Sequence, residues 1–83
     1  MMQKTVRSTI QLGHIIQQRR KELKLTQQDL AIKVGTRQAT ISFIENGEPG
    51  THIQTIFDVL GTLGLEIVLR LREKSTFAFE DIF

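Results

Sequence analysis

The fold is decided by residues 25–47, LTQQDLAIKVGTRQATISFIENG. Thr26 is placed to cap the first of two short helices, and Asp29 follows three residues later, as in a variant of the capping box. Gly35 is expected to end this helix, because glycine readily adopts the left-handed backbone of a helix C-cap. The side predicted to be buried is formed by Leu30, Ala31 and Val34.

A second helix is predicted directly after this turn. Thr36 is a candidate N-cap one residue beyond Gly35, so the helix should begin at Arg37. It should end at Asn46 and Gly47, since a glycine commonly follows the last helical turn. Its buried side is formed by Ile41 and Ile44. The pattern therefore predicts two short helices that meet across a tight turn.

Two further helices are predicted on either side of this pair. Residues 10–25 carry apolar residues at helical spacing, with Ser8 or Thr9 as the N-cap. Thr51 is the candidate cap of a fourth helix. The apolar stripe of that helix is formed by Ile53, Ile56, Phe57 and Leu60, and its end is marked by Gly61 and Gly64.

After the fourth helix, the period of the apolar residues changes to two, which is typical of a β-strand. A single strand leaves its backbone groups unpaired, and the other candidates for extended structure are residues 4–7 and 76–79. We therefore expect residues 65–71 to pair with the same segment of a second copy across a two-fold axis. The apolar residues expected to form this dimer contact are Leu65, Ile67, Leu69 and Leu71.

The charge of the chain is divided between its two halves. Residues 1–45 carry eight Lys and Arg against three Asp and Glu, and residues 46–83 carry three against six. The first half is therefore basic (+5) and the second acidic (−3). A basic half favours contact with phosphates, although a cluster of charges often does no more than face the solvent.

Residues 25–47 resemble the helix-turn-helix of the lambda-repressor/Cro (Xre) family. Ala31 is a small residue where the family's two helices cross closely, Gly35 stands at the turn, and Ile41 is the aliphatic residue that locks the pair. The resemblance implies a mainly α fold, a four- to five-helix lambda-repressor-like DNA-binding domain with a C-terminal β-strand that pairs across a dimer. Its implied parts are an N-terminal arm (1–9), the helix-turn-helix domain (10–64), a dimerisation strand (65–72) and a tail (73–83).

The resemblance also implies which residues contact DNA. The first turn of the third helix enters the major groove in this family, so its outward side chains are candidates for contact with bases. These are Arg37, Gln38, Ala39, Thr40 and Ser42. Gln38 is the favoured base reader, whereas Arg37 could equally lie along the backbone. For Phe43, packing is favoured over base contact.

Residues near the helix ends are implied as phosphate contacts, since helix N-termini and basic side chains attract anions. The candidates are Arg19, Thr26, Gln27, Lys33 and Asn46. Their alternative role is helix capping, and Thr26 can do both.

Within the family, residues 36–46 and the terminal strand look similar to HipB-type antitoxins. That resemblance implies a homodimeric repressor of its own operon, an inverted-repeat operator in double-stranded DNA, and a HipA-type serine/threonine kinase toxin as partner. A stand-alone phage-like repressor without a toxin is the alternative. The tail departs from the HipB pattern, and it could fold back on the dimer or bind a partner through Phe77, Phe79 and Phe83.

Catalysis and cofactor binding are not expected. The chain has no cysteine, and its two histidines, His14 and His52, lie on different predicted helices without metal-ligand spacing. No segment is apolar enough for a membrane span or a signal peptide, so we expect a soluble, cytoplasmic protein. A protein-interaction adaptor that does not bind DNA is a third possibility.

Overall fold

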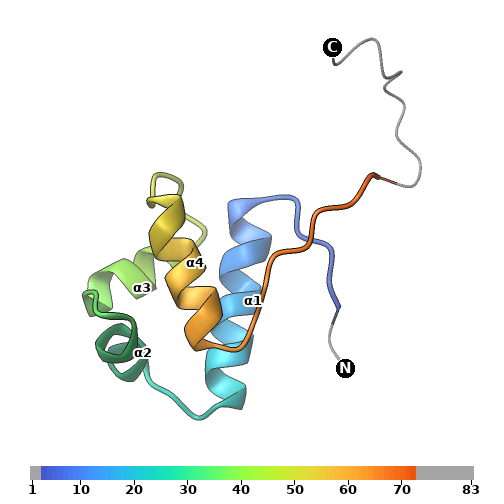
Figure 1. Ribbon diagram of the computed structural model, residues 1–83. Helices are drawn as coiled ribbons and strands as arrows, with labels where there is room; N and C mark the ends of the chain where they lie inside the picture. The colour runs from blue at the N-terminus through green and yellow to red at the C-terminus, as the bar shows by residue number, and fades with distance from the viewer. Residues whose placement is uncertain (1–2, 73–83) are drawn as a thin grey trace.

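Four helices make up most of residues 3–72, the part of the chain that the computed structural model describes (Figure 1). They are α1 (Thr9–Glu22), α2 (Gln27–Val34), α3 (Gln38–Glu45) and α4 (Ile53–Thr62). The short helices α2 and α3 pack against each other, α1 packs against α3, and α4 packs against α2 (Figure 1). The predicted mainly α architecture is confirmed. No helix within residues 3–72 is long and apolar enough to cross a membrane.

The ends of α1 and α2 follow the capping residues read from the sequence. The Ser8 hydroxyl accepts a hydrogen bond from the backbone N–H of Gln11 at 3.1 Å and so caps α1. Thr26 and Asp29 form a complete capping box on α2, and these hydrogen bonds hold the pKa of Asp29 below its usual value. Gly35 ends α2 in the left-handed region, with φ of 86°.

Three predicted boundaries are wrong by one to three residues. Helix α1 ends at Glu22 rather than Leu25, because Lys24 adopts a positive φ of 59° and turns the chain. Helix α3 is capped by Arg37, since the N–H of Thr36 still bonds to the carbonyl of Ala31 at the end of α2. The fourth helix similarly has His52 as its N-cap instead of Thr51, and Gly61 lies inside it.

The core is built from side chains of all four helices and the turn after α4. Its buried members are Ile16, Leu30, Ala31, Ile41, Ile44, Val59, Leu60 and Leu63. The predicted burial of Leu30, Ala31, Ile41 and Ile44 is confirmed. Ile53 and Phe57, however, are exposed, although they belong to the apolar stripe predicted for α4. The apolar surface of α4 is therefore wider than the single chain can cover.

Helices α1 and α3 approach each other closely at Gly13. A Cβ atom at this position would overlap the carbonyl oxygen of Ile44 and lie 2.8 Å from that of Glu45. Both obstacles are backbone atoms of α3, so a larger residue could be accommodated only if the helices moved apart.

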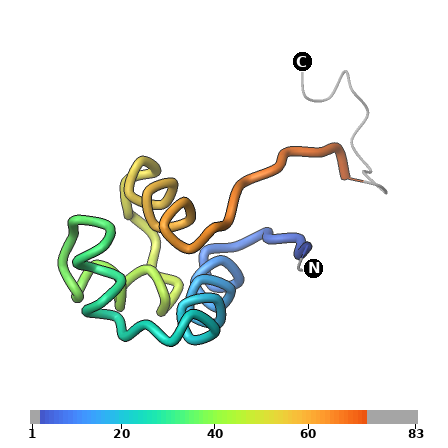
Figure 2. The backbone as a smooth tube through the Cα atoms, turned by 60° about the horizontal axis from the view of Figure 1, so that its bottom comes forward, coloured from blue at the N-terminus to red at the C-terminus, as the bar shows by residue number. Residues whose placement is uncertain are grey.

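Residues 65–72 leave the bundle beside the N-terminal arm (Figures 1 and 2). The Arg70 guanidinium donates to the Thr5 hydroxyl at 2.9 Å, which links the two segments. The predicted strand is not formed within residues 65–72 of the single chain, since a strand needs a second strand for its hydrogen bonds. Pairing across a dimer stays a prediction, and the tail at 73–83 lies outside the described residues.

We expect Gly13→Ala to lower the free energy of unfolding by about 1–3 kcal/mol, the usual cost of overpacking a close contact. Gly61→Ala is the matched control, because Gly61 is also helical and a Cβ there would meet no atom within 4 Å. That control should be neutral or stabilising by up to about 1 kcal/mol. Chemical denaturation measures both, and equal stability of the two variants would contradict the close contact.

Candidate nucleic-acid interface

The structure gathers the predicted base-contact residues around the start and outer side of α3. Arg37 precedes the helix as its N-cap, and the side chains of Arg37, Gln38 and Ala39 are exposed. Thr40 and Ser42 are half-buried. The inner side of the helix is occupied by Ile41 and Ile44, so these five residues occupy the remaining, outward part of its circumference.

Gln38 is held in place by a hydrogen bond to the neighbouring helix. Its side-chain Nε2 donates to Oε1 of Gln27 at 2.6 Å, and Nε2 of Gln27 in turn donates to Oε1 of Glu45 at 3.1 Å. Gln27, predicted as a phosphate contact, is therefore positioned between α2 and α3 as a support for Gln38. With one N–H engaged in this way, the Gln38 amide is oriented by Gln27 before any ligand is present.

The chain of hydrogen bonds ends in a buried ion pair between α1 and α3. The Arg20 guanidinium donates from Nε to Glu45 Oε2 at 2.7 Å and from Nη2 to Oε1 at 3.0 Å. Its Nη1 donates to the Leu25 carbonyl at 2.8 Å. The hydrogen bonds to Glu45 raise the pKa of Arg20. The sequence interpretation missed this pair, although Glu45 lies one turn beyond Ile41 on the buried side of α3.

The other predicted phosphate contacts have different surroundings. Thr26 caps α2, while Lys33 and Asn46 are exposed at the ends of α2 and α3. Arg19 donates from Nε to the Leu63 carbonyl at 2.9 Å and pairs with Glu22 at 3.3 Å, so it connects α1 to the end of α4. The structure does not bring Arg19 into the hydrogen-bonded group of Gln27 and Gln38.

A shallow groove separates the outer side of α3 from the start of α4. Its α3 wall includes Thr40 and Phe43, and its opposite wall includes Thr51, His52 and Thr55. Phe43 is 42% exposed, so the packing predicted for this side chain is only partial. The groove and the first turn of α3 form one continuous surface, because Arg37 and Ala39 border both.

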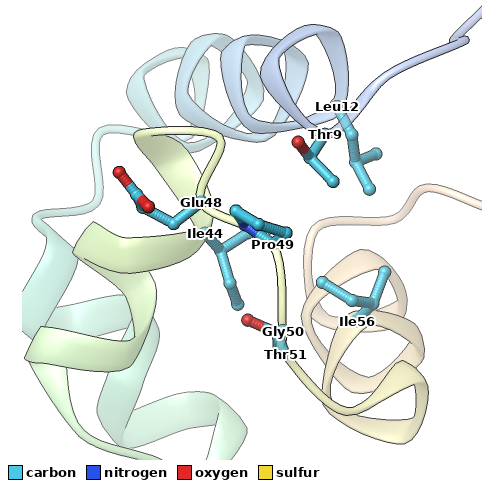
Figure 3. Close-up of a pocket in the computed structure, with 8 residues that line it drawn as sticks. All are labelled: Thr9, Leu12, Ile44, Glu48, Pro49, Gly50, Thr51 and Ile56. Atoms are coloured by element: carbon cyan, nitrogen blue, oxygen red, sulfur yellow. The ribbon is translucent and has the colours of Figure 1, made fainter.

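A second, smaller pocket lies between α1, the loop at residues 48–51 and α4 (Figure 3). Leu12, Ile44 and Ile56 supply apolar walls, and the Thr9 hydroxyl beside it donates to the Gly47 carbonyl at 2.7 Å. Glu48 is the single ionisable residue among those that line it. Because Thr9, Glu48, Pro49 and Gly50 are exposed, this pocket is a small hollow in the surface. Within residues 3–72, no three His, Cys, Asp or Glu residues lie close enough to hold a metal ion.

Comparison with known proteins identifies the family. Residues 16–69 match the family described as helix-turn-helix. The chain belongs to this helix-turn-helix family. Among its relatives are two proteins named antitoxin HipB, from Escherichia coli strain K12 and from E. coli O6:H1 strain CFT073. Each is 39% identical over 62 residues, which are 75% of this chain and 70% and 66% of the respective relatives. The chain thus spans about two thirds of their length.

Solved structures share the helix-turn-helix fold over most of the chain. A chain of the HipA-HipB-O2-O3 complex is 35% identical, has a TM-score of 0.77, and covers 87% of this chain and 100% of that chain. The HipB-O4 20mer complex gives the same values. The restriction-modification controller protein C.AhdI of Aeromonas hydrophila has a TM-score of 0.64 at 21% identity, over 70% of this chain and 84% of that chain. The similarity to C.AhdI concerns the fold alone, and this fold is the predicted lambda-repressor-like fold.

We expect Arg20→Met to destabilise the helix-turn-helix domain by about 3–5 kcal/mol, because the Glu45 carboxylate would stay buried without its partner. The double variant Arg20→Met with Glu45→Leu removes both charges and should be clearly more stable than the single variant. Urea denaturation followed by circular dichroism measures the difference. If the single variant were the more stable of the two, the pair would not be a coupled unit.

Proposed function

We propose that this chain is a homodimeric, sequence-specific DNA-binding repressor and the antitoxin of a HipBA-like toxin-antitoxin module. The observation that carries this proposal is its match to the full length of a chain from the HipA-HipB-O2-O3 complex, at 35% identity and a TM-score of 0.77. The alternative, a stand-alone phage-like repressor, would share the DNA-binding surface but lack the toxin. Both act by binding, so no catalytic residue is assigned.

DNA recognition would centre on α3 in the major groove. With one N–H of Gln38 bound to Gln27, its amide oxygen and second N–H can grip adenine, which offers an N6 donor and an N7 acceptor. Arg37 has the fork for guanine or a phosphate, while Ala39, Thr40 and Ser42 complete the base-facing set. The network from Arg20 to Gln38 supports this role, since it fixes the amide before binding and lowers the entropy lost on contact.

Phosphate contacts would flank this set and supply affinity without sequence preference. Lys33 and Asn46 are exposed, and Thr26 lies at the start of α2, where free N–H groups attract anions. Arg19 is the weakest member of the proposed set, because its guanidinium already bonds Leu63 and Glu22. The basic charge of residues 1–45 adds a general attraction to DNA.

Dimerisation would use the segment after α4. Arg70 bonds Thr5 of the N-terminal arm, and Ile67 in the same segment is 45% exposed. Leu65 packs against the core, whereas Leu69 and Leu71 are 90% and 93% exposed. Pairing with a second copy would cover these side chains and satisfy the backbone groups. The exposed Phe57 and Ile53 of α4 offer further apolar area to a second copy.

The proposed protein partner is a HipA-type serine/threonine kinase toxin, because the relatives are named antitoxin HipB and one solved complex joins HipA with HipB. Phe77, Phe79 and Phe83 in the tail are proposed as additional contacts with such a partner. A repressor and its toxin would both act in the cytoplasm, where the DNA is.

DNA binding is tested by selecting bound duplexes from a randomised pool. We expect an inverted repeat with half-sites about 34 Å apart or a multiple of it. The logarithm of the binding constant should fall by about 0.9 per log unit of salt for each neutralised phosphate.

Gln38→Ala should relax the preference at one base pair per half-site, where it removes about 1–3 kcal/mol of discrimination between bases. Lys33→Ala should weaken all sequences alike. Uniform weakening by Gln38→Ala would contradict its assigned role, and an unselective pool would refute the repressor.

The antitoxin role is tested by expressing the neighbouring open reading frame with and without this chain, both from a foreign promoter. We expect the neighbour alone to arrest growth, and co-expression to restore growth and yield a complex that purifies together. The Gln38→Ala variant is the matched control, because it alters a DNA contact and should still neutralise the toxin. A harmless neighbour that purifies alone would leave the stand-alone repressor as the function.

A further inference from the structure

The outward side of α3 carries an apolar pair, Ala39 and Phe43. The two residues are four positions apart, so their Cβ atoms lie about 5–6 Å from each other on one side of the helix. Ala39 is exposed, and Phe43 is 42% exposed. The buried positions of the same helix are filled by Ile41 and Ile44, so this pair is directed away from the core.

Folding accounts for only part of the phenyl ring at this position, since Phe43 is 42% exposed. Phe43 borders the groove whose opposite wall consists of Thr51, His52 and Thr55, all of which carry polar groups. The ring is therefore partly left in water, which costs free energy in proportion to the exposed apolar area. Because Ala39 and Phe43 together form an apolar patch on the side of α3 that carries the proposed base readers, they point to a ligand with an apolar group nearby.

We propose that Phe43, together with Ala39, reads the 5-methyl groups of thymines in the major groove. The inference rests on the proposed DNA-binding function and adds a specificity-determining residue to it. Phe43 has no hydrogen-bond donor or acceptor, and the thymine methyl is the one apolar group that base edges present in this groove. Gln38 and Phe43 then recognise complementary features, since the partner of an adenine is a thymine whose methyl lies in the same groove. Half-sites rich in A·T pairs follow from this arrangement.

The test replaces each thymine of the selected half-site, one at a time, with deoxyuridine, which removes only the methyl group. We expect one or two positions at which the wild-type protein binds about fourfold more weakly, the factor that corresponds to about 0.8 kcal/mol for one buried methyl. The Phe43→Ala variant should bind the thymine duplex about as weakly as the wild type binds the deoxyuridine duplex. At one of those positions, replacing thymine with deoxyuridine should not lower the affinity of this variant any further.

Three comparisons separate the outcomes. Ile32→Ala removes a 67% exposed apolar side chain from α2 and should keep both affinity and methyl sensitivity. Phe43→Leu retains an apolar side chain and should keep the sensitivity to removal of the methyl group. The deoxyuridine series on the wild-type protein tests the inference without any variant. Selective binding that ignores every methyl, or full methyl sensitivity in Phe43→Ala, overturns the inference and leaves the repressor intact. Loss of all sequence preference in the wild type would instead overturn the proposed function, and this inference with it.

Discussion

The arrangement of the whole domain depends on two opposite charges that are buried together. Arg20 comes from α1 and Glu45 from the end of α3, and each would be costly to bury alone. Their bidentate contact fixes the position of α3 against α1, while the bond from Arg20 to the Leu25 carbonyl fixes the turn into α2. Three of the four helices are thus positioned by one guanidinium.

The same carboxylate connects the interior to the surface. Glu45 accepts from Gln27, and Gln27 accepts from Gln38, so the direction of an exposed amide is set by charges in the core. A buried ion pair adds little net stability over apolar residues of similar size, because desolvation offsets its attraction. We interpret the contribution of the Arg20–Glu45 pair as geometric, because hydrogen bonds to charged groups are directional and apolar contacts are not. The close approach at Gly13 has a similar effect on α1 and α3.

The fold could be predicted from local signals, whereas parts of the site could not. Gly35 and the capping box of Thr26 located α2 correctly, because caps and positive φ depend on neighbouring residues. The start of α3 shifted to Arg37 because the Thr36 N–H bonds back to α2, a tertiary detail of the turn. Arg20 lies among other charged residues of α1 and its partner is 25 positions away, so the local charge pattern does not distinguish it from a solvated residue.

Apolar periodicity predicts that a side will be covered, but it does not identify what covers it. The stripe of α4 and the alternation of residues 65–71 were both read from the same kind of pattern, and in the single chain Leu60 is buried while Phe57, Leu69 and Leu71 are exposed. Part of the apolar surface that the pattern predicts to be covered is therefore left uncovered in one copy of the chain. Phe43 poses the same problem on α3, where the groove beside it is lined by the hydroxyl-bearing Thr40, Thr51 and Thr55, and a base edge is its proposed complement. An apolar residue that its own fold leaves exposed is thus informative about a binding partner when it lies beside other candidate contact residues, as Phe43 lies beside Ala39 and Thr40.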